Sequence, residues 1–297
     1  MPTLPARAAL AALLIAAAQP CARAAEPFAA PEAWFKPAAP FRIAGNIYYV
    51  GTQGLSAYLI TSGRQAILLD GTMAENAPLI EKNIAALGYK MDEVKIILNN
   101  HAHLDHAGAM AQLKRDSGAA VYASAEDRSA LEHGRHEGDS EYAYLTFPPV
   151  AVDRVLADGE TITLGDIRLT ATLTPGHTKG CTTFSMPVTD GGRTLQVVFP
   201  CSITVAGNVL VGNTTYPGIV ADFEKSFARL GAMKADVVLT GHPEATDVFG
   251  RAAKLKAGDK DAFVDPTLLG RLVGKAKTDF AKTLKTEQAG KKSATGK

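Results

Sequence analysis

The sequence predicts a layered α/β fold, and three observations support that prediction. In the first half of the chain, short apolar runs typical of strands alternate with segments of helical periodicity. The second half is rich in strand-like runs and also contains two amphipathic segments. Hydrophobic residues make up 46% of the chain, which is enough for a sizeable core, and no low-complexity linker divides it. We therefore expect one compact unit without a sequence repeat.

The first elements lead into a histidine-rich segment. Three apolar runs bounded by glycine and serine predict a meander of short strands: 46–50, 57–61 and 66–70. Residues 75–87 carry apolar side chains at helical spacing, and Gly88 supplies a C-terminal stop. Residues 94–98 are apolar except for Lys95, which predicts a strand buried on both faces. This strand ends directly before the histidine-rich segment.

The same periodicities define the remaining elements. Further strands are predicted at 120–123, 161–164, 167–173, 182–186, 194–199 and 237–239. Further helices are predicted at 107–115, 125–133, 222–233 and 266–287. We expect irregular structure at 25–41, a long loop at 134–149 and a frayed end at 290–297.

The N-terminus has the features of a secretory signal. Arg7 gives a short basic start, residues 8–18 form a small apolar run, and Ala22-Arg23-Ala24 offers an A-x-A cleavage site. The apolar run is too short for a transmembrane anchor, which needs about 20 residues. We expect residues 1–24 to be a signal peptide and residues 25–297 to be a single domain exported to the periplasm, with no membrane attachment in the mature form.

Net charge and cysteine content limit the binding partners and cysteine chemistry that we expect. Cleavage would remove Arg7 and Arg23 and no acid, so 31 basic against 30 acidic residues would become 29 against 30. Near-neutral charge gives no reason to expect nucleic acid or an anionic membrane surface as a partner. Cys181 and Cys201 would remain, and an oxidising compartment would let them form a disulfide. Neither lies in a C-x-x-C motif, although Cys201 alone could be a metal ligand.

Residues 99–108 constrain the chemistry most. They contain four potential metal ligands within six positions: His101, His103, Asp105 and His106. In extended backbone, residues two apart point the same way, so His101 and His103 can bind one metal. Asp105 and His106 are offset toward a second metal, although Asp105 could also cap the following helix.

Two distant histidines complete the candidate metal site. His177 and His242 each follow a glycine just past a predicted strand, where loops on a rigid scaffold carry function. His133 and His136, with Asp139 nearby, lie in a charged, loop-like stretch. We interpret that stretch as solvated surface.

The segment His-Ala-His-Leu-Asp-His-Ala-Gly at residues 101–108 resembles the signature of the metallo-β-lactamase superfamily. The Gly-His and Gly-His-Pro segments at His177 and His242 match its downstream ligands in order and spacing. The resemblance implies an αβ/βα four-layer sandwich, with two mixed β-sheets face to face, outer helices and the metals at one edge. It also implies that Asp70 is a buried carboxylate that orients metal ligands.

The same resemblance assigns ligands to two zinc ions. The first zinc would be held by His101, His103 and His177. The second would be held by Asp105, His106 and His242.

Residues 199–204 indicate the branch of the superfamily. Many other members place a metal-bridging aspartate here, and this segment contains none. Ser202 together with His106 resembles the third subclass of class B β-lactamases, as does the segment 212–223. In that subclass Ser202 and Thr204 would bind the substrate carboxylate. Some members have serine where Thr204 stands and tyrosine at the place of Asn208, so this chain departs from them at two positions.

The same resemblance bears on Cys181 and Cys201. The cysteine ligand of other exported β-lactamases aligns with Ser202, so Cys201 is displaced by one residue and points away from the metal. We therefore favour a Cys181–Cys201 disulfide over free thiols.

The resemblance implies zinc-dependent hydrolysis of the β-lactam amide of penicillins, cephalosporins and carbapenems, and hence antibiotic resistance. Hydroxide held at the metals would be the nucleophile, with Asp105 as ligand and orienter and His177 essential. The chain has neither S-x-x-K nor G-x-S-x-G, which argues against a serine nucleophile. We expect a monomer acting on a small molecule.

Two alternatives and one question of specificity stay open. The chain could be another metallo-hydrolase of the superfamily, a lactonase or thioesterase, or a non-catalytic periplasmic zinc-binding protein. Substrate choice could depend on the aromatic residues Trp34 and Phe35 and on the loop with Tyr142, Tyr144 and Phe147, although these rings could simply pack.

Overall fold

The computed structural model describes residues 28–295, so the expected signal peptide lies outside the described residues. From Pro31 onward the described chain belongs to one compact unit. Among the described residues, no helix is both long and apolar enough to cross a bilayer.

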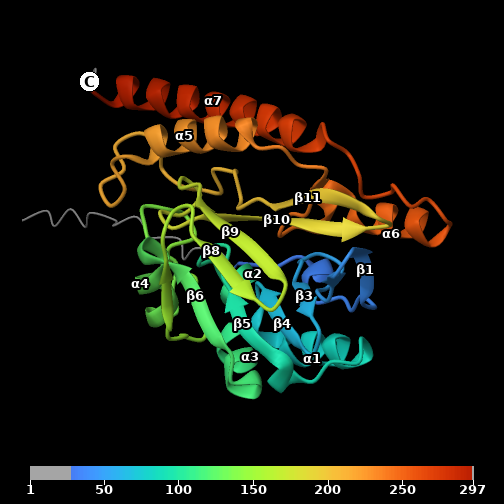
Figure 1. Cartoon of the computed structure of the whole chain (residues 1–297). Helices are drawn as coiled ribbons and strands as arrows, with labels where there is room; N and C mark the ends of the chain where they lie inside the picture. Colours follow the sequence, from blue (N-terminus) through green and yellow to red (C-terminus); the bar gives the residue numbers. More distant parts are fainter. Residues whose placement is uncertain (1–27, 296–297) are drawn as a thin grey trace, which may run out of the picture. The chain divides into compact units, whose positions relative to one another are not determined.

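The first sheet has seven strands that pair in sequence order (Figure 1). They are β1 (Phe41–Ala44), β2 (Ile47–Tyr49), β3 (Tyr58–Ser62), β4 (Gln65–Leu69), β5 (Val94–Leu98), β6 (Ala120–Ser124) and β7 (Arg154–Leu156). Neighbouring strands from β1 to β4 are antiparallel, whereas neighbouring strands from β4 to β7 are parallel. The crossovers contain the helices α1 (Ala77–Ala86), α2 (Leu104–Ala107), α3 (Met110–Ser117) and α4 (Ala125–His133).

The second sheet has five strands in the order β12-β11-β10-β9-β8. They are β8 (Thr161–Leu164), β9 (Ile167–Leu173), β10 (Thr182–Asp190), β11 (Arg193–Phe199) and β12 (Val237–Val238). β8 to β11 form an antiparallel meander, and β12 joins β11 in parallel. The helices of this half are α5 (Ile219–Ala232), α6 (Val248–Lys256) and α7 (Leu268–Thr295).

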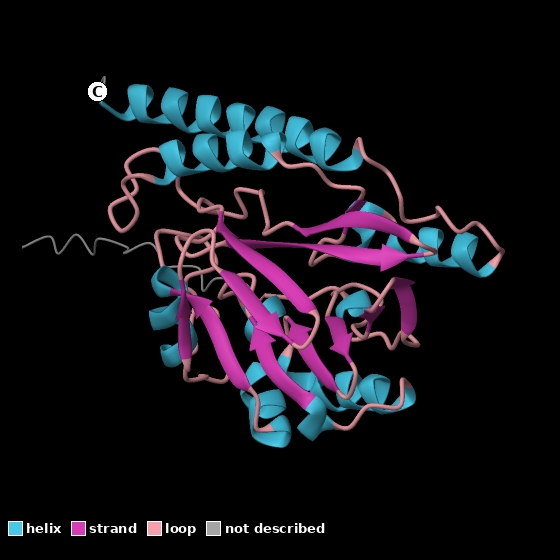
Figure 2. Cartoon of the chain, in the orientation of Figure 1, coloured by secondary structure: helices cyan, strands magenta, loops and turns pink. Residues whose placement is uncertain are grey.

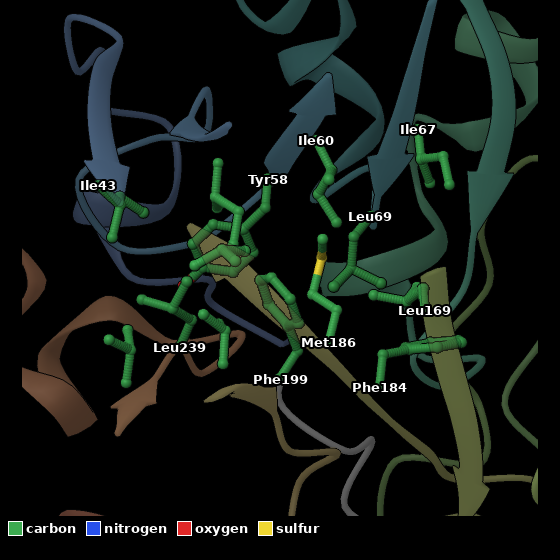
Figure 3. Close-up of a cluster of buried hydrophobic side chains, with 14 of the residues drawn as sticks. Ile43, Tyr58, Ile60, Ile67, Leu69, Leu169, Phe184, Met186, Phe199 and Leu239 are labelled. Carbon is green, nitrogen blue, oxygen red and sulfur yellow. The ribbon is translucent and has the colours of Figure 1, made fainter. Parts of the chain in front are cut away.

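Each sheet is buried on both faces, so the fold has four layers. Successive side chains of a strand point to opposite faces, so Leu59 and Leu68 pack under α1 while Ile60 and Ile67 face the other sheet. Figure 3 shows this central core, where Leu169, Phe184, Met186 and Phe199 of the second sheet meet side chains of the first. The helices α5 and α7 lie on the outer side of the second sheet (Figure 2). Val198 of β11 packs in one cluster with side chains of both helices. The expected sandwich of two mixed sheets with outer helices is therefore confirmed.

Several element boundaries differ from the expectation. The predicted helix 107–115 is divided into α2 and α3 at Gly108, where a Cβ would lie 2.6 Å from both Ala74 N and Leu104 O. β1, β7 and α6 were not predicted, and α7 runs on to Thr295 through the expected frayed end. Short 3-10 turns occupy Glu32–Trp34, Ala74–Asn76, Met91–Glu93 and Pro243–Thr246.

Candidate metal centre

The six candidate ligands lie just beyond the ends of strands, four of them on loops and two, Asp105 and His106, in the short helix α2. The segment with His101, His103, Asp105 and His106 follows β5, and His242 follows β12. His177 lies between β9 and β10. The two sheets are joined beside these loops, because the backbone N–H of Thr182 donates to the carbonyl of Asn100 at 2.9 Å. Both sheets therefore contribute ligands to one edge of the sandwich.

His101, His103 and His177 form a first cluster. One nitrogen atom from each lies within 4.8 Å of the others. The Nδ1 atom of His177 donates to the Thr204 carbonyl at 2.8 Å, so its Nε2 carries a lone pair. The Nδ1 atom of His101 faces the amide oxygen of Asn100 at 3.1 Å, which assigns the same tautomer.

The two lone pairs of this cluster face each other. The Nε2 atoms of His101 and His177 are 3.1 Å apart, and the side chains around them are buried. Two imidazole lone pairs at that distance repel unless a cation lies between them. The arrangement therefore fits a metal ion that accepts both.

Asp105, His106 and His242 form a second cluster. The carboxylate of Asp105 lies 3.2 Å from His242 Nε2 and 3.7 Å from His106 Nε2. His106 donates from Nδ1 to Asp70 at 2.8 Å, and its buried Nε2 has no hydrogen-bond partner among the described residues. Such an atom is expected where a ligand is to be bound. Nitrogen and carboxylate donors of this kind suit zinc.

Electrostatics hold the histidines of the first cluster, and Asp105 in the second, in the metal-binding form. For His106, burial would lower the pKa, but attraction to Asp105 and Asp70 outweighs it and raises that pKa. Burial, reinforced by the neighbouring imidazoles, holds the pKa of His101 and His103 well below the ordinary value. Burial also lowers the pKa of His177 to about 4. Burial would raise the pKa of Asp105, but attraction to His106 and His242 outweighs it and leaves that pKa below its usual range. Neutral imidazoles and an ionised carboxylate are the states that bind metals.

Asp70 lies where the sequence places an orienting carboxylate. It is buried after β4, accepts the N–H of Asn100 at 2.8 Å with one oxygen and binds His106 with the other. Its φ of 62° lies in the left-handed region, which is unusual for a residue other than glycine. The hydrogen bond fixes which nitrogen of His106 is free.

Residues 202–208 support His177. The hydroxyls of Ser202 and Thr204 are 3.1 Å apart and partly accessible. Asn208 donates to the carbonyl of His177 at 3.0 Å. A cavity of about 250 Å³ opens beside His103 and His177 and is lined also by Asn208.

Cys181 and Cys201 form a disulfide, with Cα atoms 5.7 Å apart. The Sγ atom of Cys201 lies 3.7 Å from Nδ1 of His101. Because both sulfurs are in the disulfide, the alternative of Cys201 as a thiolate ligand is wrong for this structure.

His136 does not lie on solvated surface as expected. It is 5% exposed, and its ring stacks on that of His103 with centroids 4.1 Å apart and planes at 10°. The ring of Phe147 lies edge-on to that of His136, with centroids 6.3 Å apart. The charged stretch misled the prediction, because its neighbours point outward while this one ring turns in. His133 is exposed as expected.

The two aromatic segments, which were expected either to influence substrate choice or simply to pack, differ in their positions. The ring of Trp34 lies 5.7 Å from that of His242, so the N-terminal segment borders the second cluster. In the 134–149 loop Phe147 is buried, whereas Tyr144 is 53% exposed. Sequence reasoning missed Asp127, which contacts two of the three ligand-bearing segments and has no metal-binding motif around it.

Comparisons with known proteins agree with this geometry. The family model described as the metallo-beta-lactamase superfamily matches residues 50–242. The structure of BJP-1, a subclass B3 metallo-beta-lactamase of Bradyrhizobium japonicum, is 43% identical with a TM-score of 0.83, over 87% of this chain and 98% of that one. The FEZ-1 metallo-beta-lactamase from Legionella gormanii is 40% identical with a TM-score of 0.82, over 85% and 98%.

A curated relative is more distant. The chain is 28% identical over 160 residues to a hydroxyacylglutathione hydrolase of Maricaulis maris, covering 53% of this chain and 51% of that protein. The chain thus spans about half the length of that relative. The family match includes all six clustered ligands and the structural likeness extends over most of the chain, so this protein belongs to the metallo-β-lactamase superfamily of metal-dependent hydrolases.

Proposed function

We propose that this protein hydrolyses the amide bond of β-lactam antibiotics with two zinc ions. The observation that carries the proposal is the pair of histidine and aspartate clusters, with facing lone pairs at His101 and His177. Its support is the 43% identity to a subclass B3 β-lactamase over most of both chains.

The residues divide the work between binding and orientation. His101, His103 and His177 would hold one zinc, and Asp105, His106 and His242 the other. When bound, the zinc ions would lower the pKa of water toward about 7 and supply hydroxide near neutral pH.

The loop after β11, residues 202–208, supplies the groups that would orient His177 and the substrate. Thr204 fixes the tautomer of His177 through its carbonyl. The hydroxyls of Thr204 and Ser202, which hydrogen-bond each other at 3.1 Å, would turn to donate to a substrate carboxylate. The cavity beside His103 and His177 gives room for a substrate group. The side chain of His242 is about a third exposed, so the second cluster is open to solvent and to substrate.

The location of the protein belongs to the same proposal. We infer that residues 1–24 direct export and that residues 25–297 act in the periplasm as a monomer. The disulfide Cys181–Cys201 supports an oxidising compartment.

A thioesterase or lactonase is the second candidate, favoured by the likeness to hydroxyacylglutathione hydrolase. That likeness covers only about half of either chain. A non-catalytic zinc-binding protein is the third.

One assay separates these candidates. Turnover of nitrocefin and imipenem is measured beside S-lactoylglutathione and a homoserine lactone, with and without a chelator. We expect chelator-sensitive turnover of the β-lactams alone. Preferred cleavage of the thioester or lactone would support the second candidate, and zinc binding without any hydrolysis would support the third.

The variant His177→Ala tests the site directly. It should abolish β-lactam turnover while circular dichroism shows the fold retained, because His177 belongs to the buried cluster rather than to the core between the sheets. Near-normal turnover would contradict the proposed role.

A further inference from the structure

Asp127 links the two loops that carry the first cluster. It lies in the first turn of α4 and is 4% exposed. Its carboxylate accepts three hydrogen bonds: from Ala102 N–H at 3.0 Å, from the Thr178 hydroxyl at 2.9 Å and from Gly180 N–H at 3.0 Å. Neither oxygen is required by α4 itself, because Ser124 caps that helix.

The donors come from the immediate neighbours of the ligands. Ala102 stands between His101 and His103, and Thr178 follows His177. These loops leave different sheets, so one carboxylate sets their separation. A buried carboxylate is costly unless it is hydrogen-bonded, and the three donors and the carboxylate therefore stabilise one another.

A glycine shows how closely the second loop approaches Asp127. A Cβ on Gly180 would lie 2.5 Å from the carboxylate carbon of Asp127 and 2.1 Å from the hydroxyl oxygen of Ser124. Gly180 has no positive φ, so its lack of a side chain serves this approach rather than a turn.

We propose that Asp127 is a positioning residue that sets the spacing of His101, His103 and His177 and so the metal affinity of the first cluster. This inference rests on the proposed zinc sites. An aspartate fits the three donors because an ionised carboxylate only accepts. An asparagine would turn its NH₂ group toward at least one of the donors.

The test is stepwise zinc binding by the whole mature protein, measured by competition with a chromophoric chelator. Asp127→Asn should weaken the first cluster by roughly 10- to 100-fold, the usual effect of losing a group that orients ligands. The second cluster should change by less than about threefold, since none of its three residues adjoins a donor to Asp127 and His106 is oriented by Asp70 instead. The visible spectrum of Co²⁺ at the first cluster should also change.

Two further variants separate positioning from general stability. Ser117→Ala removes a hydroxyl that bonds Leu113 O and Ala119 N–H at the end of α3, away from both loops, so it should lower Tm by a few degrees and leave zinc affinity unchanged. Thr178→Val removes one donor from Asp127 at nearly constant volume. It should weaken the first cluster by roughly 2- to 10-fold, the effect of one hydrogen bond.

The outcomes distinguish this inference from the proposed function. Wild-type protein that binds no zinc would overturn both. Wild-type protein that binds two zinc ions, with Asp127→Asn binding them equally well, would overturn the role of Asp127 alone. Equal weakening at both clusters would also overturn it, because a loss of general stability has no preference between them. Should Asp127→Asn fail to fold, unchanged zinc affinity in Thr178→Val would overturn the inference.

Discussion

His136 supports the site from outside the metal-binding motif. α2 carries Asp105 and His106 but has no side-chain cap of its own, and the N–H of Leu104 in its first turn donates to Nε2 of His136 at 2.9 Å. Because that nitrogen must accept, the ring proton is on Nδ1 and the ring is neutral. Burial lowers the pKa of His136 to about 4, which keeps it neutral at pH 7.

Replacing His136 should therefore destabilise the protein. His136→Ala removes the cap of α2 and the ring that packs on His103. We expect a loss of about 2 kcal/mol or more in the free energy of unfolding, from the cavity and the unpaired N–H. Urea denaturation of the metal-free protein measures it. His133→Ala is the matched control, because His133 is exposed, and it should change the free energy by less than about 0.5 kcal/mol. Equal effects of the two variants would contradict this role.

At the scale of elements, Asp265 joins α6 to α7. Its carboxylate forms ion pairs with the guanidinium groups of Arg251 in α6, at 3.3 Å, and of Arg271 in α7, at 2.8 Å. It also accepts the N–H of Thr267 at 3.2 Å, at the start of α7. Hydrogen bonds from Arg271 and Thr267 hold the pKa of Asp265 well below its usual range. The long outer helix is therefore fixed at its beginning by one carboxylate.

This network makes stability depend on pH. A carboxylate whose pKa is lowered on folding stabilises the protein above its unfolded pKa, about 3.9, and this contribution is lost as pH falls through the folded pKa. Asp265→Asn should lower the free energy of unfolding by about 1 kcal/mol at pH 7, and the difference from wild type should shrink below pH ~4. Denaturation at several pH values measures it.

Asp261→Asn is the control for this prediction. Asp261 pairs with Arg193, and its side chain is 60% exposed, so its replacement should have a smaller effect at pH 7. A difference between Asp265→Asn and wild type that is as large at pH 2 as at pH 7 would contradict the assigned cause.

At the scale of the whole molecule, the ligands connect the two sheets. Metal that binds only the folded protein stabilises it by mass action, by roughly 2.7 kcal/mol per site when free zinc is about 100 times its Kd. A chelator should therefore lower Tm, and zinc should restore it. His177→Ala, which keeps the second cluster, should recover only part of this gain. A Tm that zinc and chelator leave unchanged would contradict the presence of the sites.

The sequence allowed much of this architecture to be predicted because apolar runs are local signals. β5, β8 and β9 were predicted with their observed bounds. β7 was missed because two of its three residues, Arg154 and Val155, are exposed at the edge of the sheet. The fold as a sandwich came from the resemblance at residues 101–108 and not from periodicity.

The contacts of the site show the limit of such reasoning. The residues of the two clusters could be named because they share a dense motif or follow Gly-His. The roles of His136 and Asp127 could not be predicted, because they come from contacts with residues 25 to 53 positions away in the chain. A single sequence carries no local signal for such pairs.

The placement of the ligands has a consequence for assembly. A cut in the turn between β7 and β8 would separate His101, His103, Asp105 and His106 from His177 and His242. Each trio would be split two to one, so neither fragment could fill either coordination sphere alone. Metal uptake by a mixture of the two fragments would then show that they had associated.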